Sequence, residues 1–268
     1  GTGDFYTYSR NAARFNVSTK GVDVTWRPVL NGTVNGVSAS EDGVALAGYF
    51  TKVNDVNTVK LAYLSPTAGT ISKPWVWKPS YPINTTNGGF QFDVQHAHSE
   101  VWAGGSEHLI AQYSLSDLSR MSSSITRSGG DFQDLQLDTN TDVMYGACHC
   151  GNWVYEGGDL YQTPWDTASD IHRIRLVGAF DAQTGDVLPE FSPEISGDKG
   201  YGVWESFVDS NGVLWAGGDI TRSRGSGGGQ AVGVTRTSTA AHRGARRRWS
   251  GVMVDLSRAG MGLRKRGA

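Results

Sequence analysis

The residues best suited to chemistry follow a series of related segments, each of which closes on a small residue at the end of a short apolar strand. Imidazole and carboxylate side chains can bind polar ligands or transfer protons. If the segments pack around one axis, side chains at equivalent places lie on one face. We expect four such residues to rim a shared ligand pocket: Glu107, His108, His149 and Asp219. The alternative is that they only satisfy hydrogen bonds within their loops.

Cys148 and Cys150 are the two cysteines of the chain. In an extended strand their side chains point to the same side, because side chains alternate. Three interpretations are open: a disulfide formed in an oxidising compartment, two buried thiols that act as small apolar groups, or a metal site.

A metal site on the cysteines would need further ligands close by. His96 and His98 fall near a predicted hairpin turn, roughly 20 Å or more from the cysteines at about 3.3 Å per residue. His108 or His149 would therefore be the better third ligand. No Gly-x-Ser-x-Gly or phosphate-loop motif occurs. We therefore expect no metal or other cofactor, although a glycosidase pair of carboxylates stays open.

Internal repeats predict the elements that hold these residues. The repeated segment has an alternating strand, a polar turn and an apolar strand, with hairpin signals at Asp42-Gly43 and Asn211-Gly212. Such units bury their apolar faces only against one another. They predict an all-β fold, a partial β-propeller of about five blade-like antiparallel units. The four clear copies are 36–48, 92–104, 135–147 and 205–217.

A second repeated element follows some of these segments, with a turn, a glycine and then an aromatic residue near a proline. Its copies are 15–28, 64–79 and 180–193. The aromatic residues Trp26, Trp75 and Phe191 are expected to pack between neighbouring sheets.

The repeats divide the chain into two parts. Residues 1–230 are predicted to form the propeller, entered inside a blade, so that either further blades upstream are missing or the ring closes with unusually few blades. Residues 231–268 carry nine basic residues and one acidic residue, whereas the preceding part carries 15 and 25. This basic, low-order tail is a disordered segment, a shifted reading frame or, with little support from aromatic residues, a nucleic-acid arm.

The repeats resemble the bacterial secreted β-propeller repeats called delta-60 repeats. The resemblance covers about residues 1–230 and is carried by AGYFTKVNDVNTVKLAYLSPTAG, WAGGSEH, GACHCGNW, VGAFDAQTGDVLPEFSP and GYGVWESFVDSNGVLWAGGD. It implies an uncharacterised extracellular protein, often one with several domains. A weaker likeness, at Asp181–Gly185, is to the propeller class of the quinoprotein dehydrogenases.

These observations favour a secreted, non-catalytic binding module whose partner is an extracellular glycan or protein. The acidic body gives no general attraction for nucleic acid, and no apolar stretch is long enough for membrane insertion. The chain is expected to belong to a longer multidomain protein. The alternatives are a purely structural spacer, a secreted hydrolase or lyase, and a quinone-dependent dehydrogenase with its pocket on the central face.

Overall fold

The computed structural model describes residues 10–75, 89–127, 130–151, 153–159, 163–196, 202–224 and 251–252. Among these residues the regular elements are β-strands, apart from one short 3-10 turn at Pro164–Asp166. Every strand in a sheet pairs with its neighbours in antiparallel fashion. The described part of the chain is therefore all-β, as predicted.

Four sheets form the body, and we call them blades 1 to 4. In each, the first strand pairs with the second and the second with the third. Blade 1 comprises β3 (Val34–Ala39), β4 (Val44–Gly48), β7 (Leu61–Leu64) and β8 (Ile71–Lys73). Blade 2 comprises β9 (Gln91–Ala97), β10 (Glu100–Gly105), β11 (Leu109–Ser114) and β12 (Arg120–Thr126). Blade 3 comprises β13 (Phe132–Asp138), β14 (Val143–Cys148) and β17 (Val177–Asp181), and blade 4 comprises β19 (Val203–Val208), β20 (Leu214–Gly218) and β22 (Gly251–Val252).

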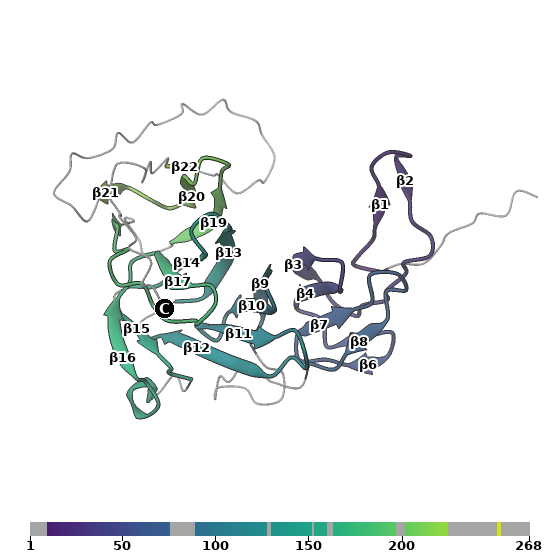
Figure 1. The fold of residues 1–268 in the computed structure, drawn as a ribbon, viewed down its shortest axis with the longest axis horizontal. Coiled ribbons are helices and arrows are strands. Elements are labelled where there is room, and N and C mark those ends of the chain that lie inside the picture. The colour runs from purple at the N-terminus through teal and green to yellow at the C-terminus, as the bar shows by residue number, and fades with distance from the viewer. Residues whose placement is uncertain are drawn as a thin grey trace, which may run out of the picture.

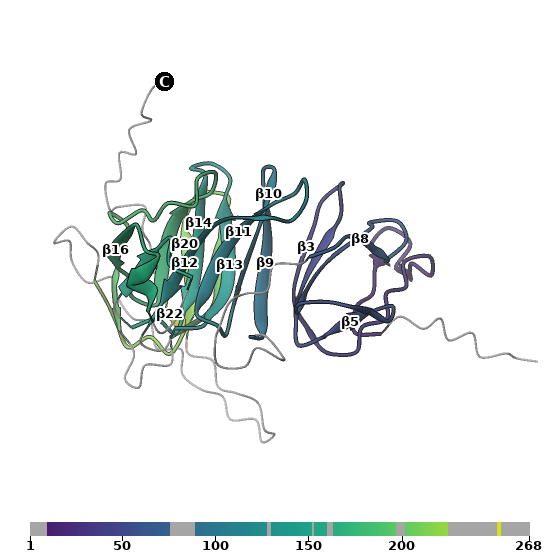
Figure 2. The same cartoon turned by 90° about the horizontal axis from the view of Figure 1, so that it is seen from below.

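The first strands of the blades lie side by side in chain order, β3 against β9, β9 against β13, and β13 against β19. The sheets extend outward from them and stack face to face in an arc (Figures 1 and 2). This radial order is that of a partial β-propeller. The described residues contain four such blades. Of the expected first unit, the described residues include a separate hairpin of β1 (Phe15–Asn16) and β2 (Gly21–Val22).

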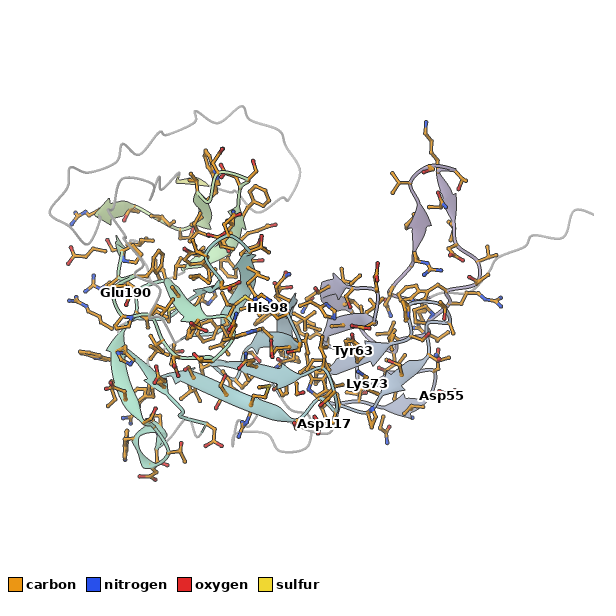
Figure 3. All side chains as sticks on the ribbon, in the orientation of Figure 1. Asp55, Tyr63, Lys73, His98, Asp117 and Glu190 are labelled. Carbon is orange, nitrogen blue, oxygen red and sulfur yellow. A yellow bond between two sulfur atoms is a disulfide. The ribbon has the colours of Figure 1, made fainter. Side chains whose placement is uncertain are left out.

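Apolar cores fill the spaces between successive blades, because each sheet buries its faces against its neighbours. Trp75 packs edge-on against Tyr113 of blade 2, with ring centroids 5.0 Å apart, and Phe191 joins the core between blades 3 and 4. Trp26 covers blade 1 on the side away from blade 2. Figure 3 shows Lys73 beside Tyr63, and the Lys73 ammonium donates to the Leu115 carbonyl of blade 2. The predicted packing between sheets is confirmed for Trp75 and Phe191, whereas Trp26 packs against blade 1 alone among the described residues.

Strands from one blade also extend the preceding blade. The hairpin of β15 (Trp153–Glu156) and β16 (Asp170–Arg173) lies in sequence between β14 and β17, yet β15 pairs with β12 and makes blade 2 six-stranded. In the same way β21 (Arg222–Arg224), which follows β20, pairs with β18 (Glu194–Ser196). Blade 1 shows a similar contact: Val53, which follows β4, forms an antiparallel bridge with Leu30, which precedes β3. These pairings tie neighbouring blades together through backbone hydrogen bonds.

Two predictions about larger features fall partly or wholly outside the described residues. The residues before Arg10 are not described, and of the predicted basic tail, 231–268, only β22 is. β22 pairs with β20 at Ala216 and Gly217. In the part of the chain that the structure describes, no helix has the length and apolar character needed to cross a membrane.

Candidate functional site

The same bulge near the start of the first strand shapes all four blades. One residue is left unpaired in each: Asn35, Phe92, Gln133 and Trp204. A bulge bends the strand and re-aims side chains. The residues that resume pairing are Gly36, Asp93, Asp134 and Glu205. Amide and aromatic side chains thus alternate from blade to blade, with carboxyl groups directly after them in three blades.

These residues surround a cavity of about 670 Å³ at the bulged ends of the first strands. The volume falls in the range of small-ligand sites. Among the described residues, the lining contains four carboxyl groups, two amides and three aromatic rings, and no Lys or Arg. The lining residues are Val34, Asn35, Tyr49, Phe92, Asp93, Asp131, Gln133, Asp134, His149, Trp204 and Glu205.

Two of the carboxyl groups also join neighbouring blades. Asp93 accepts a hydrogen bond from the backbone N–H of Leu135, at 2.9 Å. Asp134 repeats this contact with Ser206, accepting from the backbone N–H at 2.8 Å and from the hydroxyl at 2.5 Å. In both cases the donor stands one position after the equivalent acid of the next blade. These repeated hydrogen bonds hold the Asp93 and Asp134 side chains in place, and both side chains still line the cavity.

Burial gives the cavity an unusual acid–base character. It raises the pKa of Asp93 to about 8, with the nearby charge of Asp134 adding to the effect. Burial also raises the pKa values of Asp131 and Asp134 to about 6. At neutral pH Asp93 is therefore mostly protonated and can donate a hydrogen bond, whereas the other two are mostly ionised.

One wall of the cavity is formed by His149 and Trp204. Their rings meet edge to face, with centroids 4.3 Å apart. The Trp204 indole N–H donates to Asp219 at 3.3 Å. Gly202, with φ of +93°, makes this approach possible, since a Cβ there would lie 2.7 Å from the His149 ring. Burial lowers the pKa of His149, so its ring is mostly neutral at pH 7.

The opposite wall belongs to blades 1 and 2. Tyr49 stacks on Phe90 with centroids 4.1 Å apart and meets Phe92 edge-on at 6.4 Å. Tyr49 and Phe90 are each about 40% exposed. The Lys60 ammonium lies over the Phe90 ring, 5.0 Å from its centroid. Partly exposed, braced aromatic rings offer a flat surface to a ligand.

The predicted site residues take different places in this arrangement. His149 lines the cavity. Asp219 accepts a hydrogen bond from the indole of Trp204, which also lines the cavity. His108 lies behind Asp131, with 3.3 Å between its Nδ1 and the carboxylate, and burial lowers its pKa. Glu107 is buried and accepts a hydrogen bond from the Gln91 amide at 2.6 Å. It is not among the lining residues.

The backbone explains this division. Tyr49, Ser106, His149 and Asp219 each donate an equivalent N–H bond to the residue before the first strand of their blade. His149 and Asp219 thus hold equivalent positions, whereas Glu107 and His108 come one and two residues after theirs.

Cys148 and Cys150 are joined by a disulfide, and both are fully buried beside His149. His96 and His98 lie at the other end of the blades, where His96 bonds Ser38 and His98 pairs with Asp142. Within the described residues no group of three or more His, Cys, Asp or Glu side chains is arranged to hold a metal ion.

Sequence reasoning missed most of the cavity. Glu205 opens its repeated segment, Asp93 stands second in its own and Asp134 stands directly before its own, and that shared acid was a usable signal. Tyr49 stands directly after a strand end, like His149 and Asp219. Trp204 had no such sign, because its position depends on a bulge. Asp131 had none either, because the equivalent residues of the other blades, Thr33, Phe90 and Gly202, are of other types.

No family model matches the chain. No curated protein matches it in sequence either. The delta-60 resemblance therefore stays a prediction.

Solved structures resemble the chain in fold. The computationally designed Ika4 protein has a TM-score of 0.42 and 11% identity over 72% of this chain and 90% of its own. The Dos1 propeller has a TM-score of 0.43 and 13% identity over 73% of this chain. A structural genomics protein of unknown function from Bacteroides thetaiotaomicron has a TM-score of 0.35 and 12% identity over 78% of this chain. The chain spans 44% and 42% of the length of the last two. The fold assignment rests on the strand topology.

Proposed function

We propose that the chain is an extracellular binding module that holds a neutral glycan in the cavity between the first strands of the blades. The observation that carries the proposal is the composition of the lining, in which carboxyl and amide groups stand between two aromatic walls. Sugars present hydroxyl groups to polar side chains and apolar C–H faces to aromatic rings. The four carboxyl groups in the described part of this lining disfavour an anionic ligand.

The protonation states support a ligand rich in hydroxyl groups. Asp93, protonated at neutral pH, can donate, while Asp131 and Asp134 accept. Asn35 and Gln133 can do both through their amides. A hydroxyl group is itself both donor and acceptor, so each sugar hydroxyl can find a complementary partner. The buried disulfide agrees with an oxidising compartment outside the cell.

A glycoside hydrolase is the second candidate, favoured by one observation. The pKa values of Asp93 and Asp134 are pushed apart, to about 8 and about 6, and such pairs serve as acid and base in enzymes. Binding is preferred because backbone and hydroxyl donors of the next blade already hold one oxygen of each carboxyl group.

The test is isothermal titration with a panel of neutral oligosaccharides and with matched uronic acid oligomers. Trp204→Ala should reduce affinity for a neutral glycan about tenfold or more, since burying a large apolar side chain is worth about 1.5 to 3 kcal/mol. Trp153→Ala is the control, because Trp153 is exposed on β15 and lies outside the cavity lining. Binding of uronic acids alone, or equal loss in both variants, would contradict the proposal. Release of reducing sugar would favour the hydrolase.

A further inference from the structure

Cys148 departs from the pattern that the other blades follow at the end of the second strand. The equivalent residues of those blades are all glycines: Gly48, Gly105 and Gly218. A Cβ on any of these glycines would collide with the carbonyl oxygen of the residue before the first strand. The packing of the repeat therefore favours glycine at this position, and the cysteine of blade 3 indicates a role that the other blades do not need.

The disulfide adds little to the stability of the fold. Cys148 and Cys150 are two residues apart in the sequence. A disulfide stabilises a protein mainly by restricting the unfolded chain, and a short closed loop gives a small effect. The position of Cys150 is buried in every blade, and its occupants elsewhere are Phe50, Glu107 and Ile220. Burial there thus needs no covalent link, and what the link changes most is the residue that it encloses, His149.

The backbone of the enclosed turn is fixed on both sides. The His149 N–H donates to the Asp131 carbonyl at 3.0 Å. On the other side, Leu176 accepts from the Cys148 N–H at 2.8 Å and donates to the Cys150 carbonyl at 3.3 Å. Because side chains alternate along an extended chain, joining the two cysteines in the core turns the side chain between them the opposite way. His149 accordingly lines the cavity.

In the cavity wall the His149 ring braces Trp204. The two rings meet edge to face with centroids 4.3 Å apart. Gly202 packs closely against the enclosed turn, since a Cβ there would lie 2.5 Å from the Cys148 carbonyl oxygen. The placement of Trp204, which supplies one aromatic wall for the glycan, therefore depends on where the turn holds His149.

We propose that the Cys148–Cys150 disulfide positions the ligand-binding wall: it holds the His149 ring against Trp204, and without it both rings lose this arrangement while the blades stay folded. The disulfide acts through His149, because both cysteines are fully buried and neither lines the cavity. Ordering a side chain before the ligand arrives raises affinity, since that ordering no longer opposes binding. The effect on glycan affinity rests on the proposed function, whereas the placement of His149 does not.

The experiment compares three forms of the full chain: the oxidised wild type, the wild type reduced with a phosphine, and Cys148→Ala/Cys150→Ala. All three should give the same circular dichroism spectrum. Proton NMR of the His149 ring, assigned by the loss of its signals in His149→Gln, reports the contact with Trp204. The ring current of the indole should displace these signals in the oxidised chain only. In the other two forms the pKa of His149, which burial lowers, should rise toward 6.5.

Glycan affinity is the second measurement. Isothermal titration with cellohexaose and the other neutral oligosaccharides of the panel should show about tenfold weaker binding in both forms that lack the disulfide. Val143→Ala is the control, because Val143 is buried at the other end of β14. This variant should lose stability by opening a small cavity, yet keep the wild-type His149 signals and affinity.

The NMR signals decide the proposal. Unchanged His149 signals in both forms without the disulfide would overturn it, as would an equal change in Val143→Ala. Loss of the β-sheet spectrum in both forms would also overturn it, because the disulfide would then serve the fold. An oxidised chain that binds no neutral oligosaccharide would count against the proposed function and not against the placement of His149.

Discussion

Glu107 offers a direct test of how burial controls the charges near the cavity. The side chain is 1% exposed, its Oε1 accepts a hydrogen bond from Gln91 at 2.6 Å, and its Oε2 has no hydrogen-bond partner among the described residues. Burial raises its pKa from 4.5 to about 8. Because the native pKa lies above the unfolded value, the native state holds more protons between about pH 4.5 and 8. Stability conferred by the protonated group is present at low pH and is lost as pH rises through that window.

The magnitude follows from the two pKa values, whose difference corresponds to roughly 4 to 5 kcal/mol. Glu107→Gln keeps the shape and stays neutral at every pH. We expect the variant to match the wild type within about 1 kcal/mol at pH 4.5 and to exceed it by several kcal/mol at pH 8.5. Urea unfolding followed by tryptophan fluorescence at both pH values measures the difference.

The comparison between pH values isolates Glu107 from Asp93 and Asp134, which titrate in the same window in both proteins. Glu41→Gln is the control, because Glu41 is exposed in the turn between β3 and β4. If Glu107→Gln left the pH dependence of unfolding unchanged, the carboxyl group would be ionised in the fold and the reasoning would be refuted.

Three further predictions concern stability. Trp75→Ala should cost about 3 to 5 kcal/mol by opening the core between blades 1 and 2, while Trp153→Ala should cost under about 0.5 kcal/mol; equal costs by urea unfolding would argue against that core. Asp134→Ala should cost about 2 to 3 kcal/mol by leaving the Ser206 donors unpaired, and an unchanged unfolding midpoint would show that the link between blades 3 and 4 carries no stability. In the non-reduced protein, Cys148 and Cys150 should resist iodoacetamide after unfolding, and the Cys148→Ala/Cys150→Ala variant should lose about 1 to 2 kcal/mol because the closed loop is short; alkylation before reduction would contradict the disulfide.

The sequence predicts the parts of the fold that depend on patterns of neighbouring residues. The hairpins β3–β4 and β19–β20 follow from alternating apolar residues around Asp42-Gly43 and Asn211-Gly212, since side-chain period and turn chemistry are readable over short distances. The packing of Trp75 and Phe191 follows from the repeat in the same way. The pairing of β15 with β12 could not be predicted, because it joins residues about 30 apart that have no shared pattern.

The candidate site is harder to predict from the sequence, for a related reason. His149 and Asp219 could be placed because they directly follow strand ends. Phe92 and Trp204 reach the cavity through bulges, and a bulge shifts by one residue which side chain faces inward. Glu107 stands one residue after the position equivalent to His149 and Asp219, and this offset places its side chain in the interior.

A crystal structure of the chain grown with a neutral oligosaccharide tests the central claim most directly. The account predicts electron density for a sugar between Trp204 and Tyr49, with its hydroxyl groups hydrogen-bonded to Asp93 or Asp134. Density confined to the outer strands of the blades, or first strands that do not lie side by side around the cavity, would contradict it.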